Sequence, residues 1–360
     1  MKRFLGDWKL MSAFTFLVII FLIGVNAGNI ACDTCFIPFE PNELVEGVDS
    51  YSSPGTRHID DQGIVRTHFF GTDQIGRDVA SRLIHGILIA LKVGLFSSFI
   101  ALLIAIILGS LAGFIGDFGH RVNFLQLVAG ILVLVLGHYY AVEWSYMVDD
   151  RGVYRLNILR YFGLAVMVIL ILVAVFKGLH KRVDRQINVP WDSMVVKGIE
   201  VFRSIPRLFL LIAIFAVISR PSLLSVILVI GFIRWPALTR LIRAEILKVR
   251  QEDYIRNAQL LGLSPWRILI YHILPNTYQS IVVLTAFNMG SAILIEASLS
   301  FLKIGLPVGS VSWGSMLGEA RGYIPAWWMA IGPGFLIFTL ILAFNVIGSR
   351  LSFHFQALSK

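Results

Sequence analysis

Charged residues are scarce in this chain of 360 residues. Asp, Glu, Lys and Arg together make up 15% of it, against roughly 25% in soluble domains. Hydrophobic residues make up 57%, and the mean hydropathy is +0.77. Such a chain has too few polar side chains to cover a folded surface in water, which argues against an ordinary soluble enzyme and against intrinsic disorder. The composition predicts a protein with several membrane-spanning helices.

Cysteine is almost absent, because the chain holds only Cys32 and Cys35. Two cysteines cannot supply the four ligands of a structural zinc site or build a disulfide-rich scaffold. One disulfide between them and two free thiols are both open readings. A thiol oxidoreductase is disfavoured, because no basic residue or helix start near the pair would activate a thiol.

Familiar catalytic motifs are also missing. The sequence contains no G-x-x-x-x-G-K-[ST] phosphate loop, no H-E-x-x-H and no G-x-S-x-G, and its eight histidines are scattered. We therefore expect no catalytic residue, no metal site and no cofactor held by this chain.

Eight apolar stretches are long enough to cross a bilayer core of about 30 Å, which needs roughly 20 residues per helix. The first is expected to stay as a helix, since Asn29-Ile30-Ala31 is a poor signal-cleavage context. The sixth must continue through Arg234 and Pro236, and proline is tolerated where neighbours satisfy the freed carbonyl. The stretches are residues 11–28, 87–115, 124–142, 159–177, 198–219, 221–242, 277–302 and 327–349.

The net charge of +9 is unevenly distributed between the loops. Segments 29–70 and 143–158 are acidic, whereas 177–197 and 240–272 are rich in Lys and Arg. Because cytoplasmic loops carry the excess of Lys and Arg, this pattern predicts that both termini are cytoplasmic and that the acidic loops are outside. The charge thus reports orientation, and we expect no nucleic-acid partner.

The most informative loop is 252–267, with the sequence E-D-Y-I-R-N-A-Q-L-L-G-L-S-P-W-R. Asp253 suits the positive start of a short helix, and Gly262 suits the left-handed position that ends it. Ser264 and Pro265 suit the cap and first position of a second helix, which we expect to run to Leu274-Pro275. Together they predict a short helix, a glycine break and a second helix.

The short helix carries Ile255, Ala258 and Leu261 on one face. This apolar stripe could enter a groove on a partner protein or rest on lipid headgroups, and local chemistry does not choose between the two.

The loop resembles the cytoplasmic coupling loop of ATP-binding-cassette importer permeases, with the pattern E-A-A, three residues and glycine. The Asp-Tyr before it and the His-Ile-Leu-Pro-Asn after it resemble the oligopeptide, dipeptide and nickel branch. Arg256 and Asn257 depart from the pattern, which has Glu and Ala there. The matching positions are Asp253, Tyr254, Ala258, Gly262, His272, Ile273, Leu274, Pro275 and Asn276.

Two further segments resemble the same branch. Residues 70–82 contain G-T-D-x-x-G-R-D-x-x-S-R, the stretch that opens the second helix. Residues 296–302 read E-A-S-L-S-F-L and residues 312–314 read S-W-G, with Lys303 in place of a usual glycine. The three motifs stand in the family's order. The resemblance covers the first helix, about 70–121 and about 195–350.

The resemblance implies an all-α polytopic membrane protein with about eight transmembrane helices, six of them the permease core. Segment 122–194 adds two spans that the six-helix pattern lacks, and we expect it to contact lipid or an accessory partner. The expected parts are a first transmembrane helix (1–29), an extracytoplasmic loop (30–75), the core (76–121 and 195–350), the insertion (122–194) and a cytoplasmic tail (351–360).

The resemblance also implies a function and partners. The chain would be a permease subunit of the bacterial cytoplasmic (inner) membrane, forming half of a path for di- or oligopeptides or a similar small solute. It would be a transport subunit rather than an enzyme. It would work with a second homologous permease, two ATP-binding subunits that hold ATP and Mg, an extracytoplasmic substrate-binding protein and membrane lipid.

Three groups of residues are the candidate sites. The group for coupling to the ATPase is Asp253, Tyr254, Arg256, Ala258, Gly262, Ser264 and Pro265. Arg234, Glu296 and Ser298 are candidates for the path or its gating, although Arg234 could instead extend to the membrane boundary and Glu296 could cap a helix. Asp73, Arg77 and Asp78 are expected to be structural on the outer face, with Arg77 and Asp78 as an ion pair.

One alternative from another class stays open. A self-sufficient secondary transporter or channel, driven by an ion gradient, would need ionisable residues along several spans. The predicted spans hold few, chiefly Lys92, Arg234 and Glu296.

Overall fold

A computed structural model describes residues 7–30, 37, 39–44, 49–59, 65–116, 121–123, 186–188, 190–218 and 220–358. Cys32, Cys35 and the predicted spans 124–142 and 159–177 lie outside these residues. The contacts divide the chain into two compact units, Met1–Phe114 with Val195–Lys360, and Ile115–Met194.

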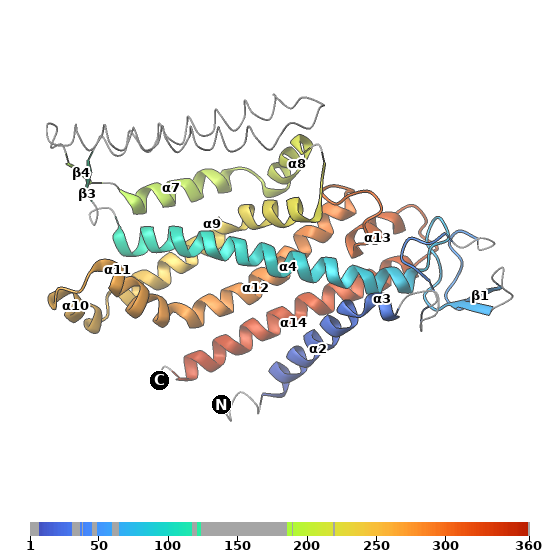
Figure 1. Ribbon diagram of the computed structural model, residues 1–360, viewed down its shortest axis with the longest axis horizontal. Helices are drawn as coiled ribbons and strands as arrows, with labels where there is room; N and C mark the ends of the chain where they lie inside the picture. The colour runs from blue at the N-terminus through green and yellow to red at the C-terminus, as the bar shows by residue number, and fades with distance from the viewer. Residues whose placement is uncertain are drawn as a thin grey trace, which may run out of the picture. The chain divides into compact units, whose positions relative to one another are not determined.

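Long helices make up most of the described chain (Figure 1). In chain order the helices are α2 (Trp8–Val25), α3 (Ala27–Ile30), α4 (Val79–Ser110), the π-helix η1 (Leu111–Ile115), α7 (Trp191–Ser204), α8 (Arg207–Val217), α9 (Leu223–Arg250), α10 (Asp253–Leu260), α11 (Pro265–Ile268), the π-helix η2 (Leu269–Ile273), α12 (Leu274–Phe301), α13 (Trp313–Ala320) and α14 (Trp328–Leu358).

Two short antiparallel hairpins accompany the helices. In the first unit β1 (Thr56–Ile59) pairs with β2 (Val65–His68), so that Thr56 lies opposite His68. In the second unit β3 (Arg121–Asn123) pairs with β4 (Gln186–Asn188).

Within the described residues, five helical stretches are long and apolar enough to cross a membrane. Each overlaps a predicted span, and α9 passes through Arg234 and Pro236 without a break. The fold class, an all-α polytopic membrane protein, is confirmed. The five stretches are Trp8–Val25, Val79–Ile115, Leu223–Arg250, Pro265–Phe301 and Trp328–Phe355.

The single helix predicted over 198–219 is wrong. α7 ends at Ser204 and α8 begins at Arg207, with Pro206 between them. Proline has no N–H to donate and restricts the residue before it to extended backbone, so α7 ends before Ile205. α8 has 11 residues and is about 16 Å long, which is too short to cross a bilayer alone.

The predicted end of the second loop helix at Leu274-Pro275 is also wrong. Helical structure continues from α11 through η2 into α12, so Pro265–Phe301 forms one stretch of 37 residues. The wider π turn lies directly before Pro275, where an ordinary α-helical turn would clash with the proline ring. Asn276 Nδ2 donates to the His272 carbonyl at 2.5 Å and satisfies that acceptor.

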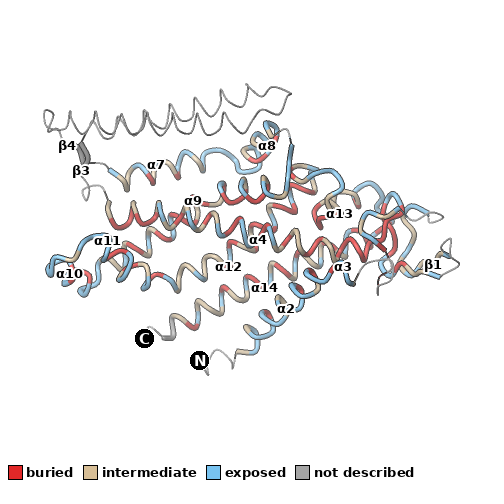
Figure 2. Tube along the Cα trace, viewed as in Figure 1, coloured by how far each residue is buried: buried red, intermediate tan, exposed pale blue. Residues whose placement is uncertain are grey.

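The first unit is a bundle in which the long helices lie side by side. α4 packs along α9 and also contacts α12, while α14 packs between α12 and α2. Small residues permit the close approach of α4 and α9: a Cβ at Gly231 would lie 2.9 Å from the Ile100 side chain and 3.0 Å from the Ser97 carbonyl. Buried residues follow these contact lines, and α2 is exposed along much of its length (Figure 2).

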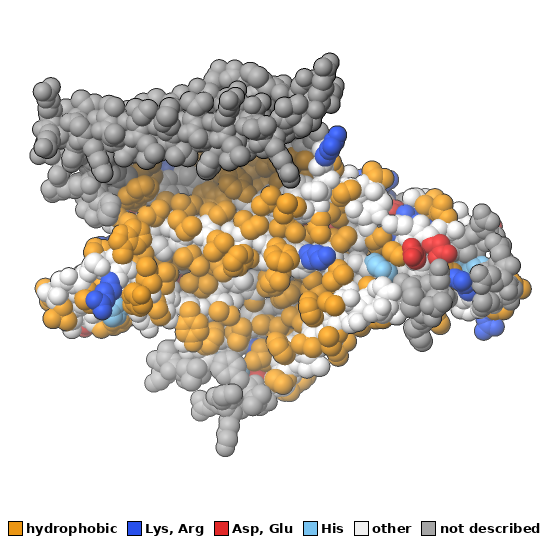
Figure 3. Space-filling view, in the orientation of Figure 1, with side chains coloured by type: hydrophobic (Ala, Val, Ile, Leu, Met, Phe, Trp, Pro, Cys, Tyr) orange, Lys and Arg blue, Asp and Glu red, His pale blue; other side chains and the backbone are white. Residues whose placement is uncertain are grey.

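Hydrophobic side chains cover much of the bundle face seen in Figure 3, as expected for helices that contact lipid or another membrane subunit. One end of the bundle carries α10 and the other carries α13 and the β1–β2 hairpin (Figure 1). These are called the α10 end and the α13 end below.

Candidate functional site

The loop at the α10 end has the predicted helix–glycine–helix structure. α10 ends in a Schellman motif: the Leu263 N–H donates to the Ala258 carbonyl at 3.2 Å and the Gly262 N–H to the Gln259 carbonyl at 3.0 Å. Gly262 has φ +75°, the left-handed conformation that favours glycine. Ser264 and Pro265 then occupy the cap and first positions of α11. The break between the two helices is therefore held by the backbone itself.

The apolar stripe predicted for α10 is only partly outward-facing. Ile255 is fully buried and Ala258 nearly so, because this face packs toward α9 and α11 of the same chain. Leu260 and Leu261 are instead 85% and 81% exposed. The exposed apolar surface at this end of α10 is therefore the Leu260–Leu261 corner.

The polar candidates on α10 lie at the surface. Arg256 and Asp253 are 3.8 Å apart and both largely exposed, so their ion pair contributes little to stability. Tyr254 is also largely exposed. Partial desolvation of its hydroxyl, and then the charge of Glu252, raise the pKa of this phenol. Asp253, Tyr254 and Arg256 thus all lie at the surface of the chain.

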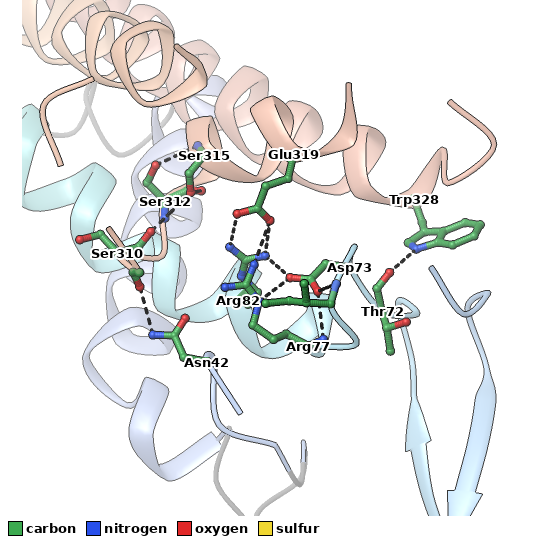
Figure 4. A network of polar contacts seen from close by, with 12 residues as sticks. Asn42, Thr72, Asp73, Arg77, Arg82, Ser310, Ser312, Ser315, Glu319 and Trp328 are labelled. Atoms are coloured by element: carbon green, nitrogen blue, oxygen red, sulfur yellow. Dashed lines mark hydrogen bonds and ion pairs between the residues drawn. The ribbon is translucent and has the colours of Figure 1, made fainter. Parts of the chain in front are cut away.

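At the α13 end, two arginines and two carboxylates form a buried network (Figure 4). Arg77 Nε donates to Asp73 Oδ2 at 2.6 Å and its Nη2 to Glu319 Oε2 at 3.2 Å. Arg82 Nη1 donates to both Asp73 and Glu319, and its Nη2 donates to Glu319 Oε1 at 3.0 Å. The charges balance, and the network ties the start of α4 to α13.

Asp78 contacts a different partner from the one predicted. The expected Arg77–Asp78 ion pair is not formed; Asp78 Oδ1 lies 2.8 Å from His68 Nδ1 in a fully buried pair. The other oxygen of Asp78 accepts from the Ser81 N–H at 2.8 Å and caps α4. The His68 ring also stacks on Phe39, with centroids 4.1 Å apart. Asp78 thus joins the helix start to β2.

Two of the three motif segments meet at this end. Gly314, from the S-W-G segment, lies so close to the Ala297 backbone that a Cβ would overlap the Ala297 carbonyl oxygen. Trp313 Nε1 donates to the Leu83 carbonyl of α4 at 2.9 Å. Trp328 Nε1 donates in the same way to the Thr72 carbonyl at 3.2 Å (Figure 4). Segments far apart in the sequence are thereby locked together.

Arg234 occupies a polar contact inside the bundle. Its Nε donates to Asn288 Oδ1 of α12 at 2.7 Å, and Asn288 Nδ2 donates to Ser98 Oγ of α4 at 3.0 Å. Asn288 and Ser98 are each 1% exposed. The guanidinium is thus anchored between three helices, and its role in the path, in gating or at the membrane boundary stays a prediction.

Glu296 and Ser298 lie on different sides of α12. Glu296 is buried, and Ser300 Oγ donates to its Oε1 at 2.7 Å. Ser298 is exposed and donates to the Leu294 carbonyl of its own helix at 2.7 Å. Of the two, only Ser298 faces outward from the chain. Lys92 is also exposed, on α4.

Sequence reasoning missed the partners that complete these sites. Glu319, His68, Asn288 and Ser98 had no role assigned, and Arg82 was noted only as a motif position. Each partner lies on another element, and nothing in the local sequence identifies it. Across the described residues, no three His, Cys, Asp or Glu side chains lie together in a way that could hold a metal ion.

Comparison with known proteins places the chain in a family. The family model described as "Binding-protein-dependent transport system inner membrane component" matches residues 185–356. A putative peptide transport system permease protein of Brucella suis biovar 1 is 35% identical over 202 residues, covering 56% of this chain and 67% of that protein. The chain belongs to this family. The prediction of an importer permease, drawn from the three motifs, is thereby confirmed.

Other relatives match over more of the chain's length. A dipeptide transport system permease protein of Alkalihalophilus pseudofirmus is 28% identical over 291 residues, covering 81% of this chain and 72% of the relative. A di/tripeptide transport system permease protein of Pseudomonas aeruginosa is 29% identical over 282 residues, covering 78% and 69%. As a member of this family, the chain is a transport subunit embedded in the membrane.

Proposed function

We propose that the chain is one of two membrane-spanning subunits of an ATP-driven importer and forms half of the path for di- or oligopeptides or a similar small solute. ATP and Mg are held by two separate ATP-binding subunits, which contact the loop 252–267. A second homologous permease completes the path, and an extracytoplasmic binding protein delivers the solute.

The observation that carries this proposal is the α10 surface. Leu260 and Leu261 are large apolar side chains that stand exposed on a short helix at the very end of the bundle. Ile255, buried on the opposite face, fastens that helix to α9 and α11. An exposed apolar corner on a rigidly held helix is typical of a protein-binding site. The peptide permeases among the relatives support peptides as the solute.

The bundle offers a direct mechanical route from this surface. When the ATP-binding subunits close on nucleotide, a displacement of α10 passes through Gly262 to α11 and along the continuous helix to Phe301. The far end of that helix contacts Gly314 of α13, and α13 also carries Glu319, which is bonded to Arg82. Closure on one side of the membrane would thus move the polar contacts on the other.

The arrangement of the chain ends supports the proposed orientation. Asp7, at the start of α2, lies 3.2 Å from His354 and 3.7 Å from Arg350 near the end of α14. These contacts support placing both ends on one side of the membrane. The Lys and Arg excess around α10 favours the cytoplasmic side.

The test replaces Gly262 by Asp in the assembled transporter, reconstituted in vesicles with ATP inside. A side chain at φ +75° costs about 1–3 kcal/mol and distorts the end of α10. We expect ATP hydrolysis to continue while solute uptake falls roughly tenfold or more, which corresponds to about 1.4 kcal/mol. Uptake and hydrolysis are measured on the same vesicles.

Gly55→Asp is the matched control, because Gly55 has φ +84° and equally open surroundings but lies beside β1. It should strain the backbone without reaching α10, and uptake should stay coupled. Undiminished uptake by Gly262→Asp would overturn the proposal. Uptake that survives ATP depletion and collapses with the proton gradient would point to the secondary transporter instead.

A further inference from the structure

The break between α7 and α8 borders a pocket of about 210 Å³ against α9. Three arginines line it: Arg203 from the end of α7, Arg207 from the start of α8 and Arg234 from α9. The remaining lining residues are apolar. The pocket is therefore basic and lacks a lining carboxylate.

These arginines have no acidic partner among the residues that the structure describes. Arg207 and Arg234 line the same pocket, so their two positive charges repel each other. Arg203 and Arg207 are exposed and Arg234 is part-buried, and an anion bound among the three side chains would offset the repulsion between them. The pocket thus lacks the negative charge that would balance it.

Arg234 is held in place for such a ligand. Its Nε is bonded to Asn288, which is fixed in turn by Ser98, so the rest of the planar guanidinium is positioned by the bundle. Guanidinium donors held in a fixed plane match the two oxygens of a carboxylate or phosphate.

The first turn of α8 adds a second attraction. Its cap is Pro206, which provides no side-chain hydrogen bond to the free N–H groups of that turn, and both Pro206 and Arg207 line the pocket. The positive end of an 11-residue helix therefore opens toward the arginines.

We propose that this pocket binds an oxyanion between Arg207, Arg234 and the first turn of α8. The oxyanion is the carboxylate of the transported solute or the phosphate of an anionic lipid. Both present oxygens of the same kind to the arginines. The solute carboxylate as ligand depends on the proposed transport function, whereas a lipid phosphate as ligand does not.

The experiment uses the full chain purified in an uncharged detergent, with the midpoint of thermal unfolding as the readout. Four probes are titrated: the dipeptide Ala-Ala, its C-terminal amide, phosphatidylglycerol and phosphatidylcholine. A ligand that binds only the folded chain raises the midpoint. We expect Arg207→Gln and Arg234→Gln to need about tenfold more of the stabilising probe, since charge-assisted hydrogen bonds are lost.

Arg220→Gln and Arg240→Gln are the matched controls, because each removes one exposed arginine outside the pocket. Both should titrate like the wild type. Arg207→Gln should leave the ligand-free midpoint unchanged or higher, because it relieves the repulsion from Arg234. Its loss of binding would therefore not reflect misfolding.

Stabilisation by the dipeptide but not its amide identifies the solute carboxylate. Stabilisation by phosphatidylglycerol but not phosphatidylcholine identifies a lipid phosphate. The proposal is overturned if no anionic probe raises the wild-type midpoint, or if the pocket variants titrate like the wild type or no worse than the controls. The measurement needs neither ATP nor partner subunits, so its failure is distinct from a failure of ATP-coupled uptake.

Discussion

Arg82 and Glu319 form a two-point ion pair although 237 positions separate them in the chain. Arg82 Nη1 also donates to Asp73, so one buried guanidinium joins three elements: the segment before α4, α4 itself and α13. Because this pair holds α13 against the bundle, the α13 end should depend on it for stability.

Removing the negative charge of Glu319 should destabilise the chain. In Glu319→Gln, Arg77 and Arg82 would share the single carboxylate of Asp73, leaving a buried positive charge that is incompletely compensated. Breaking such a pair costs about 3–5 kcal/mol. Thermal unfolding of the purified chain in detergent should show a clearly lower midpoint. Arg256→Gln is the control, since its exposed pair with Asp253 is worth at most about 1 kcal/mol; equal effects of the two substitutions would contradict the prediction.

Gly314→Ala should separate α13 from α12. The added Cβ would overlap the Ala297 carbonyl oxygen, and a helix backbone cannot move aside cheaply. Overpacking of this kind costs about 1–3 kcal/mol, which should appear as a lower unfolding midpoint. Gly290→Ala is the matched substitution on α12, because the nearest atom there, in Ile341, lies at an ordinary 3.5 Å. That variant should be as stable as the wild type, and a comparable loss in it would show that the Ala297 contact is unimportant.

Acid should weaken the attachment of α2 to α14 through Asp7. Burial raises the pKa of Asp7, but the Leu10 N–H, the charge of Arg350, His354 and the Lys9 N–H outweigh it and lower the pKa below 3.8. The folded chain then binds this proton less readily than the unfolded chain. The stabilisation is therefore complete above pH 3.8 and is lost as the pH falls through the lowered pKa.

The check is the unfolding midpoint of wild type and Asp7→Asn across this range. Above pH 3.8 the variant should unfold at the lower temperature, and the two curves should converge in stronger acid. A constant gap between them at every pH would mean that the charge of Asp7 is not responsible.

Long apolar runs and local helix signals could be predicted from the sequence. The spans around α4, α9, α12 and α14 follow from their length and hydropathy, and the Gly262 break follows from the left-handed position that it fills. Proline was harder to interpret. Pro236 and Pro333 lie inside continuous helices, whereas Pro206 separates two. Whether neighbouring helices satisfy the freed carbonyl is a property of packing, which local sequence does not contain.

The site partners escaped prediction for the same reason. Asn288 meets Arg234 across 54 positions, and the contact depends on how α9 and α12 are rotated against each other. In α10, Ile255 and Leu261 are equally apolar, and only the folded chain shows that the first faces inward and the second outward. Sequence alone indicated which residues had unusual chemistry, and packing determined their contacts.

The helix from Pro265 to Phe301 has 37 residues and is about 55 Å long, well beyond the roughly 30 Å thickness of the hydrocarbon core. If the proposed coupling holds, this helix would carry a displacement from its α10 end to Phe301 through its own backbone, without a series of rearranging side chains in between. We expect the helix to bend most easily at the π turn of Leu269–Ile273, because the hydrogen bonding there departs from the α-helical pattern. The stiffness of that turn would then determine how much of the proposed displacement of α10 is transmitted to Phe301.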